Sequence, residues 1–377
     1  HQVQRIELAH QAVVEYKQLT QRLPHSQSDL VAMLPLFDTL YRAQKQLSDI
    51  KLPWLFSQVS SKHDQVMTAV PQLYQQALQM QFIPGLKNLL EEQLSSQRVM
   101  DPRYAYPTLK TYLMLGKPEQ LNKAYFKAWF MRHFKGQPKV QEQLQKYLDI
   151  ILAHSWVPIQ LNPLLVSQTQ QVLTMVPETM LAYVVLQDQA AMQLPEYQTI
   201  LDTQDMRAIF ADPMPSLYTK EGFDLVYSKL IPAVVKQVVE TDQVLGEKRF
   251  SAGRKPDAVI QGVRDLYLID YSKIWNKFIS RLKLQPIRDL QQLDHVLQAA
   301  PVAFAKLEKA IVHNTLLDIK NPPPEAPNIN DQFSEIKTAH LKPAIKQLQA
   351  LQIVIAPVLK SDNLSQTALA ASPKIAG

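Results

Sequence analysis

The chain has 377 residues, of which 46% are hydrophobic and 20% charged, and it contains no cysteine. This length allows one large or two ordinary globular domains, and the lack of cysteine excludes disulfides, thiolate metal sites and cysteine nucleophiles. A formal charge of +6 is small for this size, and the Lys and Arg residues are spread along the chain, which argues against a dedicated nucleic-acid binder.

Proline outnumbers glycine by 26 to 8. Few glycines leave little room for tight β-hairpins or phosphate-binding loops, whereas proline is easily accommodated at helix starts and between helices. We therefore predict a mainly α fold with short connections and at most minor β content.

The chain opens with His1, in the middle of a helical pattern, and shows no signal peptide. No run approaches the roughly 20 consecutive apolar residues that a membrane span needs. We interpret the sequence as a piece excised from a longer protein, so that any anchor or targeting segment lies outside it.

The first half of the chain predicts a series of helices interrupted by proline. They span about 2–22, 27–48, 63–81, 84–98, 108–115, a stretch from 118, 138–154, 163–175 and 177–192. The segment DPRYAYP at 101–107 is predicted to be a break, after which Pro107 restarts a helix that Gly116 ends. Together these helices form a predicted N-terminal helical subdomain, residues 1–200.

The second half begins where prolines bracket MRAIFAD, which is predicted to be either a short extended piece or a helical turn. Thr219 then caps a helix that Pro232 should kink. Further helices are predicted at 256–284, 287–298 and 301–319, which completes a second helical subdomain, 201–320. The segment NPPPEAPN predicts a rigid, extended linker within 321–330, and 331–377 is predicted to hold a last helix, near 330–351, and a tail.

The helix predicted at 256–284 is the longest segment with one clear period. Its apolar side chains share one face: Val259, Val263, Leu266, Tyr267, Tyr271, Ile274, Trp275, Phe278 and Leu282. Asp270 lies within that face, where a buried carboxylate must be paired or hydrogen-bonded. Asp265 diverges from Asp270 by about 140° around the helix, which makes the two a poor acid/base pair. We therefore interpret Asp270 as a structural anchor.

A search for catalytic patterns finds no HExxH and no GxSxG motif. His63, His295 and His313 have no neighbour at metal-ligand spacing. We predict no catalytic residue, no cofactor, no metal site and no enzymatic activity, although an active site assembled from distant Asp, Glu, His, Ser or Lys residues stays open as an alternative.

The loop at 246–255 is rich in basic residues, but its spacing does not fit a phosphate-binding loop. Charged loops are usually solvated, and a mobile basic loop is our first interpretation. The alternative is a partner-binding loop in which four residues contact an acidic protein surface. These residues are Lys248, Arg249, Arg254 and Lys255.

Several segments, taken in order, resemble one family. They are LKTYLML at 109–115, PSLYTKEGF at 215–223, DQVLG at 242–246, LYLIDYSKIW at 266–275 and APVAFAKLEKAIVHNT at 300–315. Their order and spacing resemble those of the IcmF/TssM proteins, inner-membrane components of type VI and Dot/Icm type IVB secretion systems. The resemblance covers most of 100–320 and, more loosely, the N-terminal helices.

This resemblance implies a periplasmic domain of a bacterial inner-membrane protein, which is anchored only by segments outside this chain. It implies a DotU/TssL-like inner-membrane partner, contacted through parts outside this chain, together with other envelope components and no nucleic acid. The family's motif positions fall on nine residues, which we interpret as structural because their types suit capping, turning and packing. They are Tyr218, Thr219, Gly222, Asp242, Gly246, Tyr267, Asp270, Tyr271 and Trp275.

Two departures from the family pattern matter. Gln243 stands where the family commonly has tryptophan, and nothing after Pro327 alternates as β-strands do. The second departure favours the shorter, type IVB-like IcmF branch, although excision ahead of a β-rich portion would look the same. The predicted function is a non-catalytic scaffold that stabilises an envelope-spanning complex. The alternative is a cytosolic, all-helical protein-binding adaptor.

Overall fold

The computed structural model describes residues 2–22, 30–48, 61–154, 156–240, 244–246, 255–320, 322–334 and 341–359. Most of these residues are helical, and the strands in this part form two small antiparallel sheets of two strands each, which confirms the mainly α prediction. Among the described helices, none combines the length and the apolar character needed to cross a membrane.

The chain forms two compact units. One comprises His1–Val176 with Gln243–Lys248, and the other Pro177–Asp242 with Arg249–Gly377. The four segments predicted from the sequence, divided at residues 200, 320 and 330, stay a prediction.

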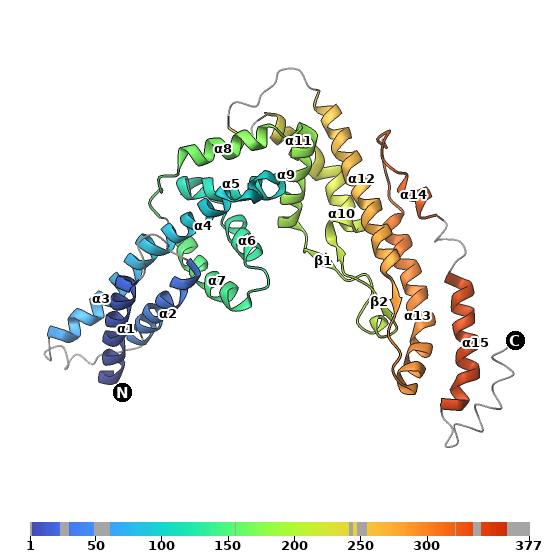
Figure 1. Ribbon diagram of the computed structural model, residues 1–377, viewed down its shortest axis with the longest axis horizontal. Coiled ribbons are helices and arrows are strands. Elements are labelled where there is room, and N and C mark those ends of the chain that lie inside the picture. The colour runs from blue at the N-terminus through green and yellow to red at the C-terminus, as the bar shows by residue number, and fades with distance from the viewer. Residues whose placement is uncertain are drawn as a thin grey trace. The chain divides into compact units, whose positions relative to one another are not determined.

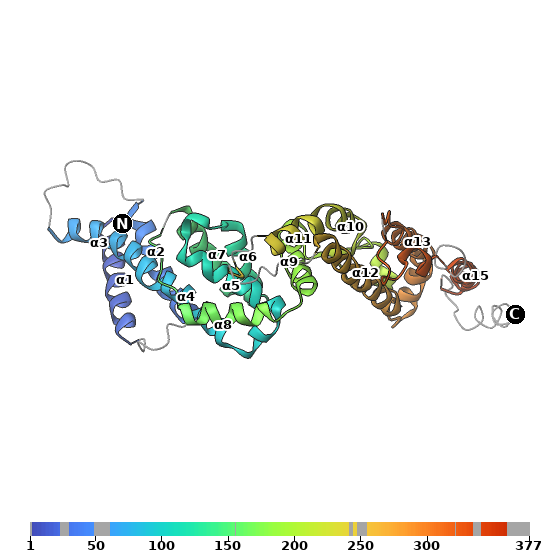
Figure 2. The ribbon, with the colours of Figure 1, turned by 90° about the horizontal axis from the view of Figure 1, so that it is seen from above.

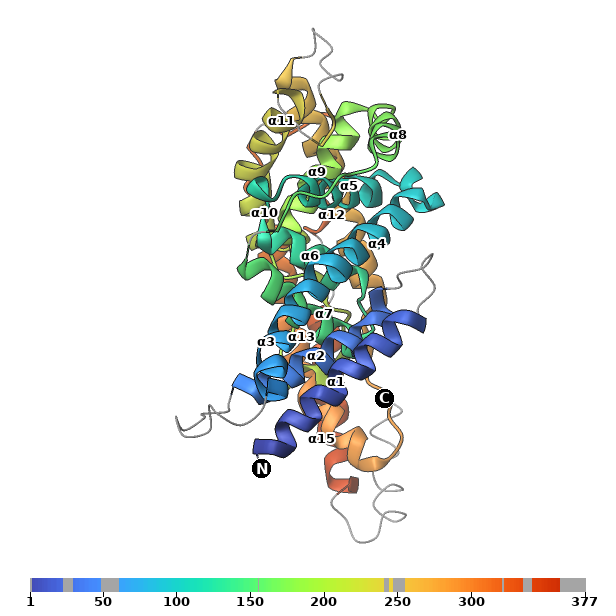
Figure 3. The same cartoon turned by 90° about the vertical axis from the view of Figure 1, so that its left-hand side faces the viewer.

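The first unit is built from helices that pack on one another. They are α1 (Gln2–Arg22), α2 (Leu30–Ser48), α3 (Ser61–Ala77), α4 (Ile83–Ser95), α5 (Pro102–Gly116), α6 (Lys123–His133), α7 (Pro138–Ala153) and α8 (Pro163–Thr174). Helices α1, α2 and α3 contact one another, and α4 lies against α5 (Figures 1 and 3). The core is aromatic, because the rings of Phe37, Phe82 and Tyr147 are fully buried with centroids 5.3 to 5.8 Å apart.

Side-chain caps, and not prolines alone, decide where two of these helices begin. Helix α5 starts at Pro102, whereas the sequence predicted a break there and a start at Pro107, because the carboxylate of Asp101 accepts a hydrogen bond from the Arg103 amide at 2.9 Å. Helix α6 starts at Lys123 and not at 118. The segment after 118 forms a short 3₁₀ turn, and Asn122 caps α6 instead.

The second unit contains both small sheets and the longest helices. Its elements are α9 (Glu178–Gln193), β1 (Tyr197–Gln198), β2 (Ile209–Phe210), β3 (Met214–Pro215), α10 (Lys220–Leu225), α11 (Ile231–Glu240), α12 (Pro256–Arg281), β4 (Lys283–Leu284), α13 (Leu290–Thr315), α14 (Ile329–Gln332) and α15 (Leu341–Leu359). Strand β1 pairs with β3 and β2 pairs with β4. Helix α12 packs against α9 and α11, and α15 packs along α13 (Figures 1 and 2).

The segment MRAIFAD contains both predicted forms, a 3₁₀ turn that ends at Arg207 and then strand β2. Helix α13 runs unbroken through Pro301, where the sequence predicted two helices. Pro301 is buried among core residues of α13, and this packing holds the helix together across the missing amide. The single last helix predicted near 330–351 is instead the short α14 and the later α15.

A π-helical turn stands directly before an Ile-Pro pair in each unit. The turn Leu78–Phe82 precedes Pro84, and the turn Val226–Leu230 precedes Pro232. The amide before each proline donates to the carbonyl five residues earlier, so the helix widens where proline cannot supply an amide. The disturbance expected at Pro232 takes this form.

The proline-rich segment after α13 returns to the second unit instead of standing apart from its core. Pro323 is buried, and Ile329 at the start of α14 is fully buried. Ser272 of α12 donates a hydrogen bond to the Gln332 side chain at 2.7 Å. The segment therefore helps to cover α12.

Asp38 joins α2 to α7 in the first unit. Its carboxylate accepts hydrogen bonds from Tyr147, from Lys146 Nζ at 2.9 Å and from Gln143 Nε2 at 3.2 Å. Burial by itself would raise the pKa of this carboxyl, but the three hydrogen bonds outweigh burial and lower the pKa below its ordinary value.

Asp38→Asn is expected to lower the free energy of unfolding by about 2 kcal/mol at neutral pH, because charge-assisted hydrogen bonds are lost. A folded-state pKa below the unfolded value of about 3.9 gives stability that is present above about pH 4 and is lost as the pH falls through the folded pKa. Urea unfolding should therefore show a smaller difference between the two proteins at about pH 3 than at neutral pH. Asp149→Asn, at a carboxylate that is 54% exposed, is the control with little expected effect. A difference independent of pH would contradict the assignment.

Candidate functional site

Seven of the nine residues predicted at motif positions lie in or near the segment 215–223, called here the motif segment. It leaves strand β3, forms a 3₁₀ turn at Ser216–Tyr218 and enters α10. Thr219 is buried and caps α10, since its hydroxyl accepts from the Gly222 amide at 3.2 Å and donates to the Ser216 carbonyl at 2.9 Å. The segment thus turns sharply around the Thr219 hydroxyl, while the buried Ser216 hydroxyl has no hydrogen-bond partner among the described residues.

Gly222 is required by the closeness of this turn. A Cβ added at Gly222 would lie 2.1 Å from the Ser216 carbonyl oxygen and 2.8 Å from that of Leu217. Both obstacles are backbone atoms, which cannot rotate away as a flexible side chain could. Any residue other than glycine would therefore force the turn open.

Helix α12 holds the motif segment through aromatic hydrogen-bond donors. The Tyr267 hydroxyl donates to the Leu217 carbonyl at 2.7 Å, and the Trp275 indole donates to the Tyr218 carbonyl at 2.8 Å. Tyr267 and Trp275 are fully buried, so their hydrogen bonds satisfy carbonyl groups that water does not reach.

A second contact ties the segment to the end of α13. The Asn314 side chain accepts from the Lys220 amide at 2.8 Å, and the Asn314 carbonyl accepts from the Tyr271 hydroxyl. Asn314 and Tyr271 are both buried. One asparagine therefore joins the first turn of α10 to the tyrosine of α12.

Ring contacts fill the space between these hydrogen bonds. Tyr218 stacks on Tyr267 with centroids 5.8 Å apart, and Phe223 meets Tyr271 edge to face at 6.4 Å. Burial raises the pKa of Tyr267 and of Tyr271 well above the ordinary tyrosine value. These hydroxyls therefore stay protonated and act as donors, as a packed core requires.

Asp270 lies at the margin of this cluster. Its carboxylate accepts a hydrogen bond from the Tyr183 hydroxyl of α9 at 2.8 Å, and Lys273 Nζ is 4.0 Å away. The Asp270 side chain is 36% exposed, whereas Tyr267, Tyr271 and Trp275 of the same face are fully buried. Burial, then the neighbouring Tyr218 and Asp270, raise the pKa of Tyr183. Asp270 thus receives one donor and retains contact with solvent.

Asp270→Asn is expected to lower the free energy of unfolding by about 1 kcal/mol, since the amide oxygen can still accept from Tyr183 and the group is half-exposed. Tyr183→Phe removes the donor and should cost a similar amount. Chemical denaturation of both variants measures this, with Asp257→Asn on the exposed first turn of α12 as the control. A loss above about 3 kcal/mol would show that Asp270 is far more deeply buried than its exposure indicates.

Seven of the nine predicted structural residues take part in this cluster or border it, and two do not. Gly246 belongs to the first unit, where its positive φ of 71° suits a turn beside Gln170. Asp242 lies outside the described residues. So do Lys248, Arg249 and Arg254 of the predicted partner-binding loop, whereas Lys255 is described and exposed.

Two residues of the cluster escaped sequence reasoning. Asn314 stands in the segment 300–315 that resembles the family, so the sequence could have marked its position as part of the motif, although not its role. Tyr183 carries no signal, because α9 is apolar on most of its surface and its buried residues do not mark one face. Only the packing of α9 against α12 gives Tyr183 its partner.

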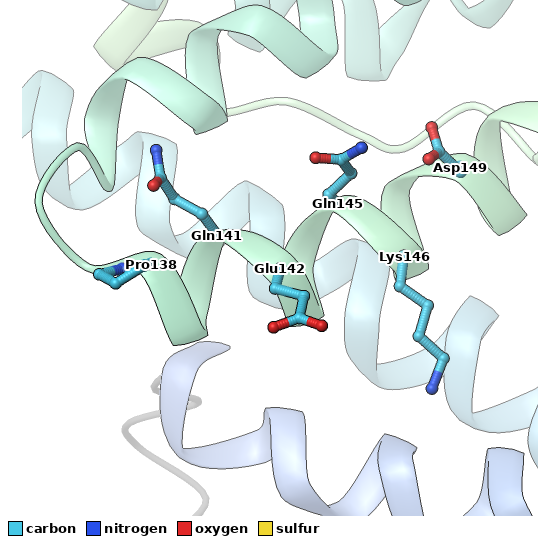
Figure 4. Close-up of a pocket in the computed structure, with 6 residues that line it drawn as sticks. All are labelled: Pro138, Gln141, Glu142, Gln145, Lys146 and Asp149. Atoms are coloured by element: carbon cyan, nitrogen blue, oxygen red, sulfur yellow. The ribbon is translucent and has the colours of Figure 1, made fainter.

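The described surface has open hollows that are lined by polar residues. One, of about 420 Å³, lies over α7 and is lined by Pro138, Gln141, Glu142, Gln145, Lys146 and Asp149 (Figure 4). Gln141 donates to the Met131 carbonyl, Lys146 Nζ donates to Asp38, and Asp149 accepts from Lys127 Nζ. These side chains already link α7 to its neighbours. Another hollow, of about 340 Å³, lies beside Glu221 and His313, which are 3.4 Å apart and about 60% exposed. Among the described side chains no group of three His, Asp or Glu is placed to hold a metal ion.

Comparisons with known proteins identify relatives of the chain. The model of a family described as IcmF-related, intracellular multiplication and human macrophage-killing, matches residues 34–315. The type VI secretion system component TssM1 of Pseudomonas aeruginosa is 26% identical over an alignment of 313 residues, which covers 78% of this chain and 28% of that protein. The chain therefore spans well under half of the curated relative that it matches. No solved structure matches it significantly.

Proposed function

Because the chain belongs to the IcmF-related family, whose model matches residues 34–315, we propose that it is a non-catalytic structural part of a bacterial secretion apparatus. The observation that carries this proposal is that motif side chains are buried in the core and bond the backbone there. Trp275 and Tyr267 are fully buried and donate to backbone carbonyls of the motif segment. A catalytic group has to reach a substrate, whereas these groups hold one part of the fold against another.

The proposed place of the chain is the periplasm, as one part of an inner-membrane protein. The resemblance of the motif segments to IcmF/TssM proteins supports this location. The proposed mechanism is mechanical, in that a rigid helical body braces other components of an envelope-spanning complex. A DotU/TssL-like protein is the proposed inner-membrane partner, which the full-length protein contacts through parts outside this chain.

Protease access to the full-length protein in spheroplasts tests this location. The segment should be digested together with periplasmic control proteins, while a cytosolic control stays intact. Protection of the segment while the periplasmic controls are digested would overturn the location and would favour the cytosolic adaptor. Lysed cells, in which every protein is accessible, show that the segment contains cleavable sites.

The branch of the family is a separate proposal. The sequence favours a type IVB-like IcmF protein, and the curated relative comes from a type VI system. Photo-crosslinking in cells from position 255, which is exposed, should capture a secretion-system component, and the identity of that component assigns the branch. Position 236 on the exposed side of α11 is the matched control. Capture of no such component from position 255 would leave the loop as a solvated segment.

A further inference from the structure

Every sulfur atom of this chain belongs to a methionine thioether, because the sequence has 11 methionines and no cysteine. Oxidants of the peroxide class react with cysteine thiolates and with methionine sulfur, which they convert to the sulfoxide. Since no thiol competes, the uptake of oxygen by sulfur depends on which methionines the solvent reaches. The fold therefore decides where oxidation of sulfur begins.

Three methionines of the first unit are strongly exposed to solvent. Met80, Met100 and Met175 have exposed fractions of 69%, 71% and 73%. Met80 lies in the π-helical turn Leu78–Phe82, Met100 ends the 3₁₀ turn before α5, and Met175 directly follows α8. Most of each side chain lies outside the packed core, so an oxygen atom added to the sulfur can remain hydrated.

Two other methionines are almost completely buried. Met33 of α2 is 4% exposed, and Met214 of β3, just before the motif segment, is 1% exposed. A sulfoxide at either position would place a polar oxygen atom in the core, which is unfavourable without a hydrogen-bond partner. An oxidant dissolved in water reaches such a sulfur only when the fold opens locally.

We propose that Met80, Met100 and Met175 are reversible oxidation sites, which take up oxygen from peroxide-class oxidants while the chain stays folded. With hydrogen peroxide the O–O bond breaks, one oxygen atom is transferred to the thioether sulfur, and water is released. The sulfur is oxidised by two electrons and the peroxide is reduced. A methionine sulfoxide reductase reverses the change, because two thiols become a disulfide and the oxygen leaves as water. The exposed sulfoxides are accessible to such an enzyme.

The consequence is a graded response to oxidants. Mild oxidation makes three apolar positions of the first unit polar and leaves the core and the motif segment unchanged. Oxidation of Met33 or Met214 needs local opening of the fold and therefore comes later. This inference does not depend on the proposed secretion role, and the topology experiment tests only that role.

The test treats the whole 377-residue chain with hydrogen peroxide at neutral pH and follows each methionine by peptide mass spectrometry. Met80, Met100 and Met175 should oxidise about tenfold or more faster than the two buried methionines. In the urea-unfolded chain, Met33 and Met214 should react as fast as the other three. After oxidation of the exposed sites, circular dichroism and the urea midpoint should be unchanged. Two sulfoxide reductases, one for each sulfoxide epimer, should restore the three methionines.

A triple variant and a single variant serve as the matched pair. Met80→Leu, Met100→Leu and Met175→Leu together replace the exposed thioethers by side chains of similar volume. This variant should take up three fewer oxygen atoms in the fast phase, while Met214→Leu should leave the fast phase unchanged. Equal rates at exposed and buried methionines of the folded chain would overturn the proposal. So would a lower urea midpoint when only the three exposed methionines are oxidised.

Discussion

Gly222→Ala is expected to lower the free energy of unfolding by about 3 to 5 kcal/mol, which is a large effect for one methyl group. The added Cβ would stand 2.1 Å from the Ser216 carbonyl oxygen, far inside van der Waals contact. Relief requires the turn before α10 to open. That movement breaks the Thr219 cap and displaces the carbonyls that Tyr267 and Trp275 bond. The loss is therefore greater than that of a single overpacked side chain.

Urea denaturation gives the size of the effect, and native-state hydrogen exchange with mass spectrometry gives its location, which should be the second unit. Gly136→Ala is the matched control, because Gly136 has a positive φ of 91° and no atom within 4 Å of an added Cβ. It should cost only about 1 kcal/mol, from backbone strain, and in the first unit. Similar losses for the two glycines would show that the close approach at the motif segment does not constrain Gly222.

Trp275→Ala should cost about 3 to 5 kcal/mol, because the side chain is fully buried and its removal leaves a cavity between α12 and the motif segment. Trp275→Phe isolates the hydrogen bond. It keeps most of the apolar volume but leaves the Tyr218 carbonyl without its indole donor, and it should cost about 2 kcal/mol.

The decisive measurement is whether Trp275→Ala lowers the free energy of unfolding more than Trp275→Phe does. Ile353→Ala, at a side chain that is 75% exposed, is the control and should change stability by less than about 0.5 kcal/mol. If Trp275→Phe and Trp275→Ala both left stability unchanged, Trp275 would not be the packing element that the structure assigns. A folded, stable Trp275→Ala protein that had lost an interaction in cells would point instead to a binding role.

Both predictions concern how the family motif works in this chain. Tyr267 and Trp275 of α12, far from the segment 215–223 in sequence, donate hydrogen bonds to its carbonyls, and Asn314 of α13 accepts from the Lys220 amide. We expect these contacts to stiffen the second unit, and a rigid body can transmit force or fix the spacing of partners. The proposed scaffold role depends on that rigidity, which hydrogen exchange of the variants measures directly.

Sequence reasoning was most successful where structure depends on neighbours along the chain. The period of apolar residues located α12 with its start at Pro256, and Thr219 was identified as the cap of α10. It failed at prolines, because Pro107 and Pro301 lie inside continuous helices. Proline disfavours a helix locally, but a cap at Asp101 in one case and burial in the core in the other outweighed that preference.

The sequence by itself determined the helical class, the family resemblance and the motif residue types, since periodicity, capping and composition are local properties. Only the tertiary structure decided which atoms meet. The Tyr271 hydroxyl donates to the Asn314 carbonyl, which is 43 residues away in sequence, and the Lys220 amide donates to the Asn314 side chain, which is 94 residues away. No local pattern encodes such pairs, because they depend on how α10, α12 and α13 pack.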